Sequence, residues 1–254
     1  MSSIGTGYDL SASQFSPDGR VFQCEYAMKA AEMSGTAIGL RGKDGCVLAV
    51  EKVITSKLHE PDSGRRIYTI ENSIGMVVCG LITDGRAVVN YALKEAQSYR
   101  RQYGQTIPLK ILNERLSSLF HAYTLYSAVR PYGVCIILTT WTEENGSEIY
   151  SIEPSGVSFG YYGCAAGKTK QGARTEIEKL KLSSLSAREL LNEGAKIIYR
   201  VNEDSSDSDT KFKLELSWVG KDTNGIHQMC PVNLYEEAKA AASAAMEQGD
   251  SDIE

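Results

Sequence analysis

The stretch GMVVCGLI at residues 75–82 contains no polar side chain. A continuous apolar run of this kind predicts a strand that is buried on both faces, whereas a half-exposed strand would alternate. Directly after it the period changes, because apolar residues over 84–103 recur at helical spacing with lysines and arginines between them. A doubly buried strand that leads into an amphipathic helix favours stacked layers, with helices outside and sheets inside.

The elements predicted on either side of this stretch follow one order: strands, two helices, strands, two helices, a hairpin and a last helix. Ser186 and Glu189 have the spacing of a capping box, and Asn224-Gly225 is a strong hairpin signal. The expected strands are 36–41, 46–52, 67–70, 75–82, 133–141, 147–154, 156–163, 211–220 and 225–230, and the expected helices are 84–103, 109–123, 169–182, 187–202 and 234–246.

This order predicts an α+β fold, a four-layer αββα sandwich of two antiparallel sheets with helices on each outer face. No repeat of fixed period and no linker divides the chain, so residues 1–254 are expected to form one domain. The polar stretches 59–66 and 203–210 are interpreted as surface loops.

Composition excludes several classes of function. The chain has 254 residues, a net charge of -5 and 42% hydrophobic residues, which is typical of a globular protein and argues against nucleic acid as a partner. Its six cysteines are scattered without a CxxC pair, which favours reduced thiols over disulfides or zinc. No apolar run is long enough for a membrane span, and no signal peptide is recognised. We expect no cofactor, no metal and no membrane partner.

One dipeptide suggests catalysis. Gly35-Thr36 at the start of a predicted strand could mark a cleavage that frees a threonine nucleophile with its own amine as base. Such an enzyme would need an acid and a lysine about 16 and 32 positions later. Those offsets give Lys52 and Tyr68, and a shift of one or two positions gives Glu51 and Arg66, of which the arginine stays protonated. We therefore favour Thr36 as an ordinary strand residue and keep an N-terminal threonine hydrolase as the alternative.

Several stretches together resemble a known family. They are YDLSASQFSPDGRVFQCEYA (8–27), GMVVCGL (75–81), AVRPYGV (128–134), IEPSG (152–156) and AAGKTKQGARTEIEKL (165–180). The sequence resembles the α-type subunits of the 20S proteasome over nearly its whole length. The resemblance implies the fold of the N-terminal-nucleophile hydrolases, with a gate segment and short helix over 1–34.

The function implied by the resemblance is that of a non-catalytic structural and gating subunit of the α ring of the core particle. Such a subunit supports assembly and controlled substrate entry for ubiquitin-dependent and ubiquitin-independent protein degradation. The implied partners are the neighbouring α subunits, the β ring below and regulatory particles or other activators. The implied location is the cytoplasm and the nucleus. A scaffold without enzyme context remains a further alternative, and it would be a monomer in dilute solution.

The family pattern also assigns residues to the gate. The cluster that holds the gate open is carried over to Tyr8, Asp9, Pro17 and Tyr26. Proline fixes φ and makes a rigid turn, and tyrosine offers a flat apolar face with one hydroxyl. In the family the short helix crosses the top of the sandwich and packs against the neighbouring subunit.

A second site implied by the resemblance is a pocket in which a lysine meets the carboxylate of an activator's C-terminal tail. Here its residues are Ser34, Arg66 and Leu81, so arginine replaces lysine, and Ser34-Gly35 replaces the usual glycine-serine order. Arginine can bind a carboxylate with two hydrogen bonds, but its guanidinium needs more room than an ammonium. The sequence leaves tail binding at this pocket undecided.

Two acidic stretches, 203–209 and the tail 247–254, are expected to be solvated and open to modification or to a basic regulator. Ser206 and Ser251 each have an acidic residue three positions later, which is similar to the sites of acid-directed kinases. A plain solvated loop is the simpler alternative at both.

Overall fold

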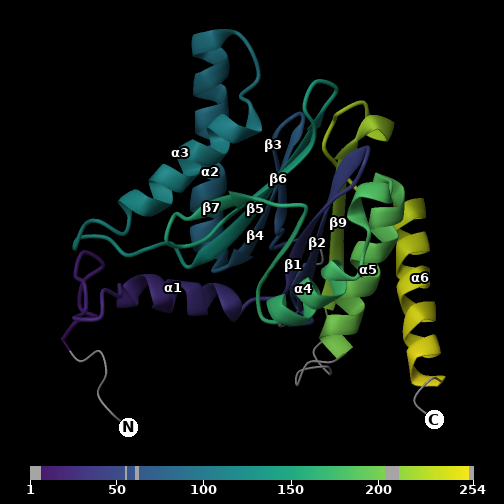
Figure 1. The fold of residues 1–254 in the computed structure, drawn as a ribbon, viewed down its shortest axis with the longest axis horizontal. Helices are drawn as coiled ribbons and strands as arrows, with labels where there is room; N and C mark the ends of the chain where they lie inside the picture. The colour runs from purple at the N-terminus through teal and green to yellow at the C-terminus, as the bar shows by residue number, and fades with distance from the viewer. Residues whose placement is uncertain (1–6, 55, 61–62, 204–211, 252–254) are drawn as a thin grey trace.

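Two antiparallel sheets lie face to face in the computed structural model, which describes residues 7–54, 56–60, 63–203 and 212–251, the last five of these by their backbone alone (Figure 1). Within this part of the chain each sheet has five strands, in the orders β10-β9-β2-β1-β8 and β3-β4-β5-β6-β7. The strands are β1 (Ala37–Arg41), β2 (Gly45–Val53), β3 (Ile67–Glu71), β4 (Ile74–Gly80), β5 (Val134–Thr142), β6 (Gly146–Ile152), β7 (Ser158–Gly160), β8 (Gly163–Ala166), β9 (Phe212–Gly220) and β10 (Gln228–Met229).

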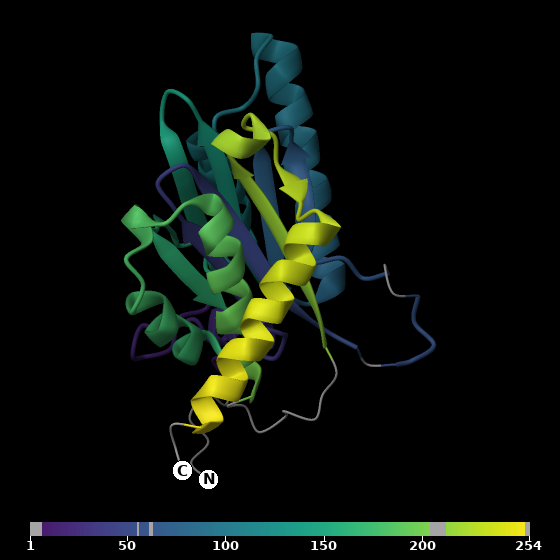
Figure 2. The ribbon, with the colours of Figure 1, turned by 90° about the vertical axis from the view of Figure 1, so that its right-hand side faces the viewer.

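Helices cover the outer face of each sheet, as the sequence predicts. The helices α2 (Ile82–Tyr103) and α3 (Leu109–Ala122) pack on the β3–β7 sheet, whereas α4 (Lys170–Glu178), α5 (Ala187–Glu203) and α6 (Val232–Ser251) lie on the other (Figures 1 and 2). Short 3-10 turns span Leu182–Ser184 and Lys221–Thr223. The fold is therefore the predicted four-layer αββα sandwich.

The strand β4 explains why the layers form. Each of its residues is buried, so both of its faces meet apolar neighbours. Met76 and Val78 face the core under α2 and α3, while Val77 and Cys79 face the core between the two sheets. The alternation along the strand thus feeds two cores, and a third lies between the other sheet and α4–α6.

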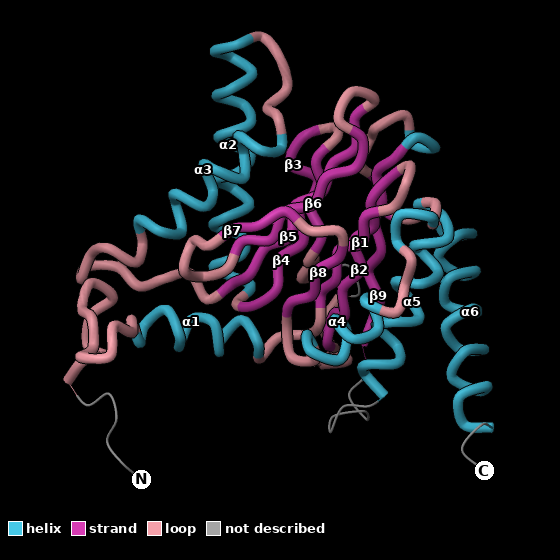
Figure 3. The backbone as a smooth tube through the Cα atoms, in the orientation of Figure 1, coloured by secondary structure: helices cyan, strands magenta, loops and turns pink. Residues whose placement is uncertain are grey.

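The helix α1 (Phe22–Glu32) belongs to neither helical layer. It crosses one end of the sandwich, where it contacts β4 and β5 (Figures 1 and 3). Phe22, Ala27 and Ala31 are its buried residues; Ala27 and Ala31 lie four positions apart on one helical face, and Phe22 is the first residue of the helix. The opposite face of the helix carries polar side chains and Tyr26.

Several predictions of elements need correction: the helix expected over 169–182 ends at Glu178, and the strand expected over 225–230 is only Gln228–Met229. Residues 156–163 do not form one strand, because β7 pairs with β6 and the chain then crosses to the other sheet, where β8 pairs with β1. The last helix is longer than 234–246, since α6 runs from Val232 to Ser251 and takes in the first residues of the expected tail. The capping box is confirmed, with Ser186 and Glu189 bonded to each other's backbone N–H.

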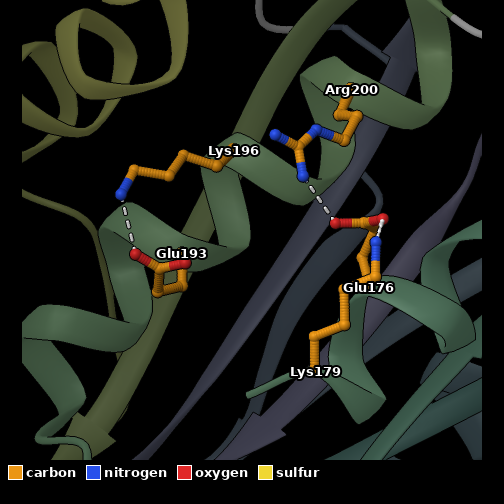
Figure 4. A network of polar contacts seen from close by, with 5 residues as sticks. All are labelled: Glu176, Lys179, Glu193, Lys196 and Arg200. Carbon is orange, nitrogen blue, oxygen red and sulfur yellow. Dashed lines mark hydrogen bonds and ion pairs between the residues drawn. The ribbon is translucent and has the colours of Figure 1, made fainter. Parts of the chain in front are cut away.

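Charged side chains form ion pairs on the surface of the helices α4 and α5. Arg200 donates from Nη1 to Oε2 of Glu176 over 2.7 Å, and Glu176 also accepts from Lys179 (Figure 4). Lys196 pairs with Glu193 within α5 at 2.7 Å. These pairs are partly exposed, so they add little stability, and of the three only Arg200–Glu176 connects α4 to α5.

Candidate functional site

The first part of the site is the segment before α1. Residues 16–19 form a turn in which Gly19 N–H donates to the Ser16 carbonyl over 2.9 Å and Pro17 holds the second position, where proline is favoured. Gly19 has φ of 76°, which suits glycine. Ser16 N–H also donates to the Arg20 carbonyl over 2.9 Å. The predicted rigid turn at Pro17 is therefore present, and it directs the chain into α1.

The structure brings two of the predicted gate residues together. Tyr26 donates from its phenol to Oδ2 of Asp9 over 3.3 Å, and the amide of Gln23 donates to the Asp9 carbonyl. Desolvation, followed by the neighbouring Asp9 charge, raises the pKa of Tyr26. Tyr8 precedes Asp9 in the same turn and is 40% exposed. Gln23, one helical turn before Tyr26, was missed because a glutamine on a helix surface carries no signal of its own.

The second part of the site is a pocket of about 640 Å³ at the C-terminal end of α1. It contains all three residues that the resemblance assigns to tail binding, although they come from distant parts of the sequence. The helix α1 supplies one wall and the first turn of α2 another. Its lining includes Ala30, Met33, Ser34, Glu51, Lys52, Arg66, Leu81 and Arg86.

The nearly buried carboxylate of Glu215 contacts two residues that line this pocket. Glu215 on β9 accepts the Arg66 backbone N–H through Oε2 over 3.0 Å, and its Oε1 lies 3.8 Å from Nζ of Lys52. Arg66 donates from Nη1 to the Gly80 carbonyl over 2.6 Å, and burial lowers the pKa of its guanidinium. Arg66 is therefore pinned to the wall, while Arg86 on α2 is exposed at the rim.

The position of Thr36 does not resemble a nucleophile's. Thr36 is fully buried, its backbone N–H donates to Oε2 of Glu51 over 3.0 Å, and its hydroxyl hydrogen-bonds to that of Thr169. The amide of Asn202 donates to Oε1 of Glu51 over 2.8 Å. Glu51 thus accepts from the residue before β1 and from Asn202 on α5, and sequence offsets alone did not reveal this arrangement.

The two serines predicted as phosphorylation sites belong neither to the gate cluster nor to the pocket. Ser206 lies outside the described residues, and Ser251 ends α6 with only its backbone described. Among the described residues, no group of three or more His, Cys, Asp or Glu side chains could hold a metal ion. In the same part of the chain, no helix combines the length and apolar character that crossing a bilayer requires.

Two family models match the chain. The family model "Proteasome subunit" matches residues 31–219, and the model of the N-terminal signature of A-type proteasome subunits matches residues 8–30. The signature covers Asp9, Pro17 and Tyr26, and it ends where the pocket begins.

Full-length relatives carry the same assignment. The chain is 57% identical to proteasome subunit alpha type-3 of Drosophila melanogaster, over 100% of this chain and 99% of the relative. It is 52% identical to the protein of that name from Spinacia oleracea, over 99% of this chain and 100% of the relative. It is 48% identical to the probable proteasome subunit alpha type-7 of Saccharomyces cerevisiae, over 94% of this chain and 83% of the relative. The chain belongs to the proteasome subunit family and carries the N-terminal signature of its α-type members.

Proposed function

We propose that this chain is a non-catalytic gating subunit in the α ring of the 20S proteasome core particle, and that its N-terminal segment helps to control substrate entry. The observation that carries the proposal is the position of α1. Tyr26 on this helix holds Asp9 of the preceding segment, while Ala30, and Met33 directly after the helix, line the pocket. One rigid element of eleven residues therefore connects the proposed gate to the proposed tail site.

The absence of catalytic activity is part of this proposal. Thr36 is buried and its backbone N–H is bonded to Glu51, so the arrangement of a free amine beside an exposed hydroxyl is not supported. The partners are neighbouring α subunits, the β ring and, at the pocket, an activator's C-terminal tail with its carboxylate near Arg66 or Arg86. The net charge of -5 does not favour nucleic acid, and no membrane contact is proposed. From the family resemblance, the proposed location of the particle is the cytoplasm and the nucleus.

A deletion tests the gating role. Particles that contain this chain without residues 2–9 should hydrolyse a small fluorogenic peptide faster in the absence of activator, because a piece of the entrance barrier is gone. A matched control removes residues 249–254 at the opposite terminus and should leave the basal rate unchanged. Native mass spectrometry verifies that both variants enter complete particles. Equal basal rates in the deletion variant and the unmodified particle would contradict the gating role.

A further inference from the structure

The buried carboxylate of Asp84, in the first turn of α2, gathers three donors. Arg130 donates from Nη1 to Oδ2 over 2.6 Å and from Nη2 to Oδ1 over 2.8 Å, and the Gly133 N–H donates to Oδ2 over 2.9 Å. Asp84 is only 8% exposed, whereas the Arg130 side chain is 61% exposed and folds back over it. Two parallel charge-assisted bonds fix both distance and orientation. The loop at 130–133 is therefore clamped to the start of α2.

Gly133 in this loop lies between two walls of the pocket. Its carbonyl accepts the Leu81 N–H over 3.0 Å. A Cβ on Gly133 would lie 2.9 Å from Cδ1 of Leu81 and 3.4 Å from Cβ of Ala30, so the backbone here fills the space between them. Since Leu81 and Ala30 both line the tail pocket, the loop sets how far apart α1 and the start of α2 stand.

The same backbone also reaches Arg66. The Gly80 carbonyl accepts from Nη1 of Arg66 over 2.6 Å, and Gly80 is held against the Gly133 carbonyl, which a side chain at position 80 would overlap. Gly80 has φ of 132°, a conformation that favours glycine. A continuous series of contacts thus runs from Arg130 through Asp84 and Gly133 to Gly80, and from there to Arg66.

We propose that Arg130, acting through Asp84 and Gly133, is a positioning residue for the tail pocket and sets the affinity of this subunit for an activator tail. The proposal rests on the proposed function of the pocket and adds a residue that lies outside its lining. Without Arg130 a buried carboxylate loses two of its three donors, which is costly. The 130–133 loop then loosens, Leu81 and Ala30 are no longer held at one separation, and part of the binding free energy goes into ordering the site.

The experiment uses assembled particles that contain Arg130→Gln, with Arg100→Gln as a matched control. Arg100 lies in the last turn of α2, the helix whose first turn holds Asp84, and its ion pair with Glu71 has similar exposure, 50% and 9% against 61% and 9%. The probe is a synthetic peptide that reproduces an activator's C-terminal tail and carries a photo-crosslinker. Mass spectrometry measures cross-linking to this chain as a function of peptide concentration, so the other pockets of the ring do not contribute.

We expect Arg130→Gln to raise the half-maximal concentration roughly three- to tenfold, with less than a twofold change for Arg100→Gln. The plateau of cross-linking should stay the same, and the particle should still assemble, with a melting temperature lowered by the donors that Asp84 loses. Arg130→Lys, which keeps the charge without the fork, should restore part of the affinity. If Arg130→Gln fails to assemble, the Lys variant alone decides, with a shift of about twofold in the same direction expected.

Two controls separate this proposal from the one on which it rests. Amidation of the peptide's carboxylate and the variant Arg66→Ala should each weaken cross-linking to this chain. If they do so while the Arg130 variants behave like Arg100→Gln, or change only the plateau or the melting temperature, then Arg130 does not position the pocket. If neither amidation nor Arg66→Ala has an effect, the pocket assignment fails and the role of Arg130 fails with it.

Discussion

The Glu51 carboxylate accepts the backbone N–H of Thr36 over 3.0 Å in the interior of the sandwich. In an N-terminal threonine hydrolase that nitrogen would be a free amine that acts as a base. Here it is the amide of the intact Gly35–Thr36 bond, and Glu51 is occupied on its other side by Asn202. The chain therefore keeps the fold of a hydrolase, but Thr36 and Glu51 form hydrogen bonds that connect the sheet to α5.

From this relationship we expect no processing at Thr36. The chain isolated from cells should have its N-terminus upstream of residue 36, and particles with Thr36→Ala should turn over peptide substrates within about twofold of the unmodified rate, since one buried hydrogen bond affects stability and not chemistry. N-terminal sequencing and a peptide-hydrolysis assay check both points. A mature terminus at Thr36 together with loss of activity in the variant would show that the chain is a peptidase.

The buried network also has a measurable effect on stability. Asn202→Ala removes a donor to Glu51 and should lower the free energy of unfolding by about 1–3 kcal/mol, because a buried carboxylate loses a partner. Asn192→Ala, a change of the same type on the same helix, should lower it by less than about 0.5 kcal/mol. Urea unfolding of the full-length chain compares them. Equal effects at both positions would mean that the Glu51–Asn202 bond contributes nothing specific.

The gate cluster gives a functional prediction. Tyr26→Phe removes the phenol that bonds to Asp9, and Asp9→Ala removes its acceptor. Each should reduce activator-stimulated peptide turnover roughly two- to fivefold without loss of ring assembly, because a near-balanced gate responds to one hydrogen bond. Tyr103→Phe, at the far end of α2, is the control for a change of an exposed tyrosine. Unchanged stimulation in both cluster variants would reject the assignment.

How much the sequence predicts depends on the range of the interaction. The apolar run at 75–82 and the helical spacing after it are local patterns, and both the doubly buried β4 and α2 are confirmed. The crossing between the sheets at 160–163 does not depend on local sequence. The strand β7 pairs with its neighbour β6, but β8 pairs with β1, in which Ala37 is opposite Ala166, more than a hundred residues away in the sequence. No periodicity within the segment shows which sheet it will enter.

The same distinction applies to the site. Ser34, Arg66 and Leu81 were predicted from the family resemblance and share one pocket, which no spacing rule would have indicated. The pair of Arg130 and Asp84 was missed, since an arginine in a loop and an aspartate in a helix are unremarkable separately. Only their bidentate geometry and the burial of Asp84 reveal that they act together.

A buried histidine gives the fold a pH dependence. His227 is 4% exposed and hydrogen-bonds to Thr69 through Nδ1 over 2.7 Å and to Ser217 through Nε2 over 2.9 Å, which links the two sheets. Gly75 makes room for the imidazole, because any Cβ there would overlap the ring. Burial lowers the pKa of His227 from 6.5 to about 4, so the folded state disfavours the protonated ring.

The sign follows from which state binds the proton. Between pH 6.5 and about 4 the unfolded chain protonates this histidine and the folded chain does not, so stability falls as the pH falls through this window. The loss should reach about 3 kcal/mol near pH 4, on top of the general acid effect. His227→Gln should show a shallower decline than the unmodified chain in urea unfolding at pH 7.5 and pH 5.0. Parallel declines would remove His227 as the cause.

The C-terminal helix is anchored well before its end. Leu234, Ala238 and Ala242 are buried against the sheet and α5, and the Tyr235 phenol donates to the Leu214 carbonyl over 3.2 Å. The acidic residues that follow Met246 come after these contacts along the helix. Folding and assembly should therefore depend on the first part of α6, and the acidic end should be available to a partner.

Truncation after Gln248 should accordingly preserve ring assembly and basal peptide hydrolysis, because every anchoring residue named above remains. It removes Ser251 together with Asp250, Asp252 and Glu254, so the effect to look for is weaker binding of a basic regulator, largest at low ionic strength, where charge is least screened. Truncation after Tyr235 is the matched control, and it should prevent assembly because it deletes Ala238 and Ala242 from the core. Native mass spectrometry and peptide hydrolysis read out assembly and activity, and regulator binding is measured at two salt concentrations. Failure of the chain truncated after Gln248 to enter the particle would make the acidic end structural.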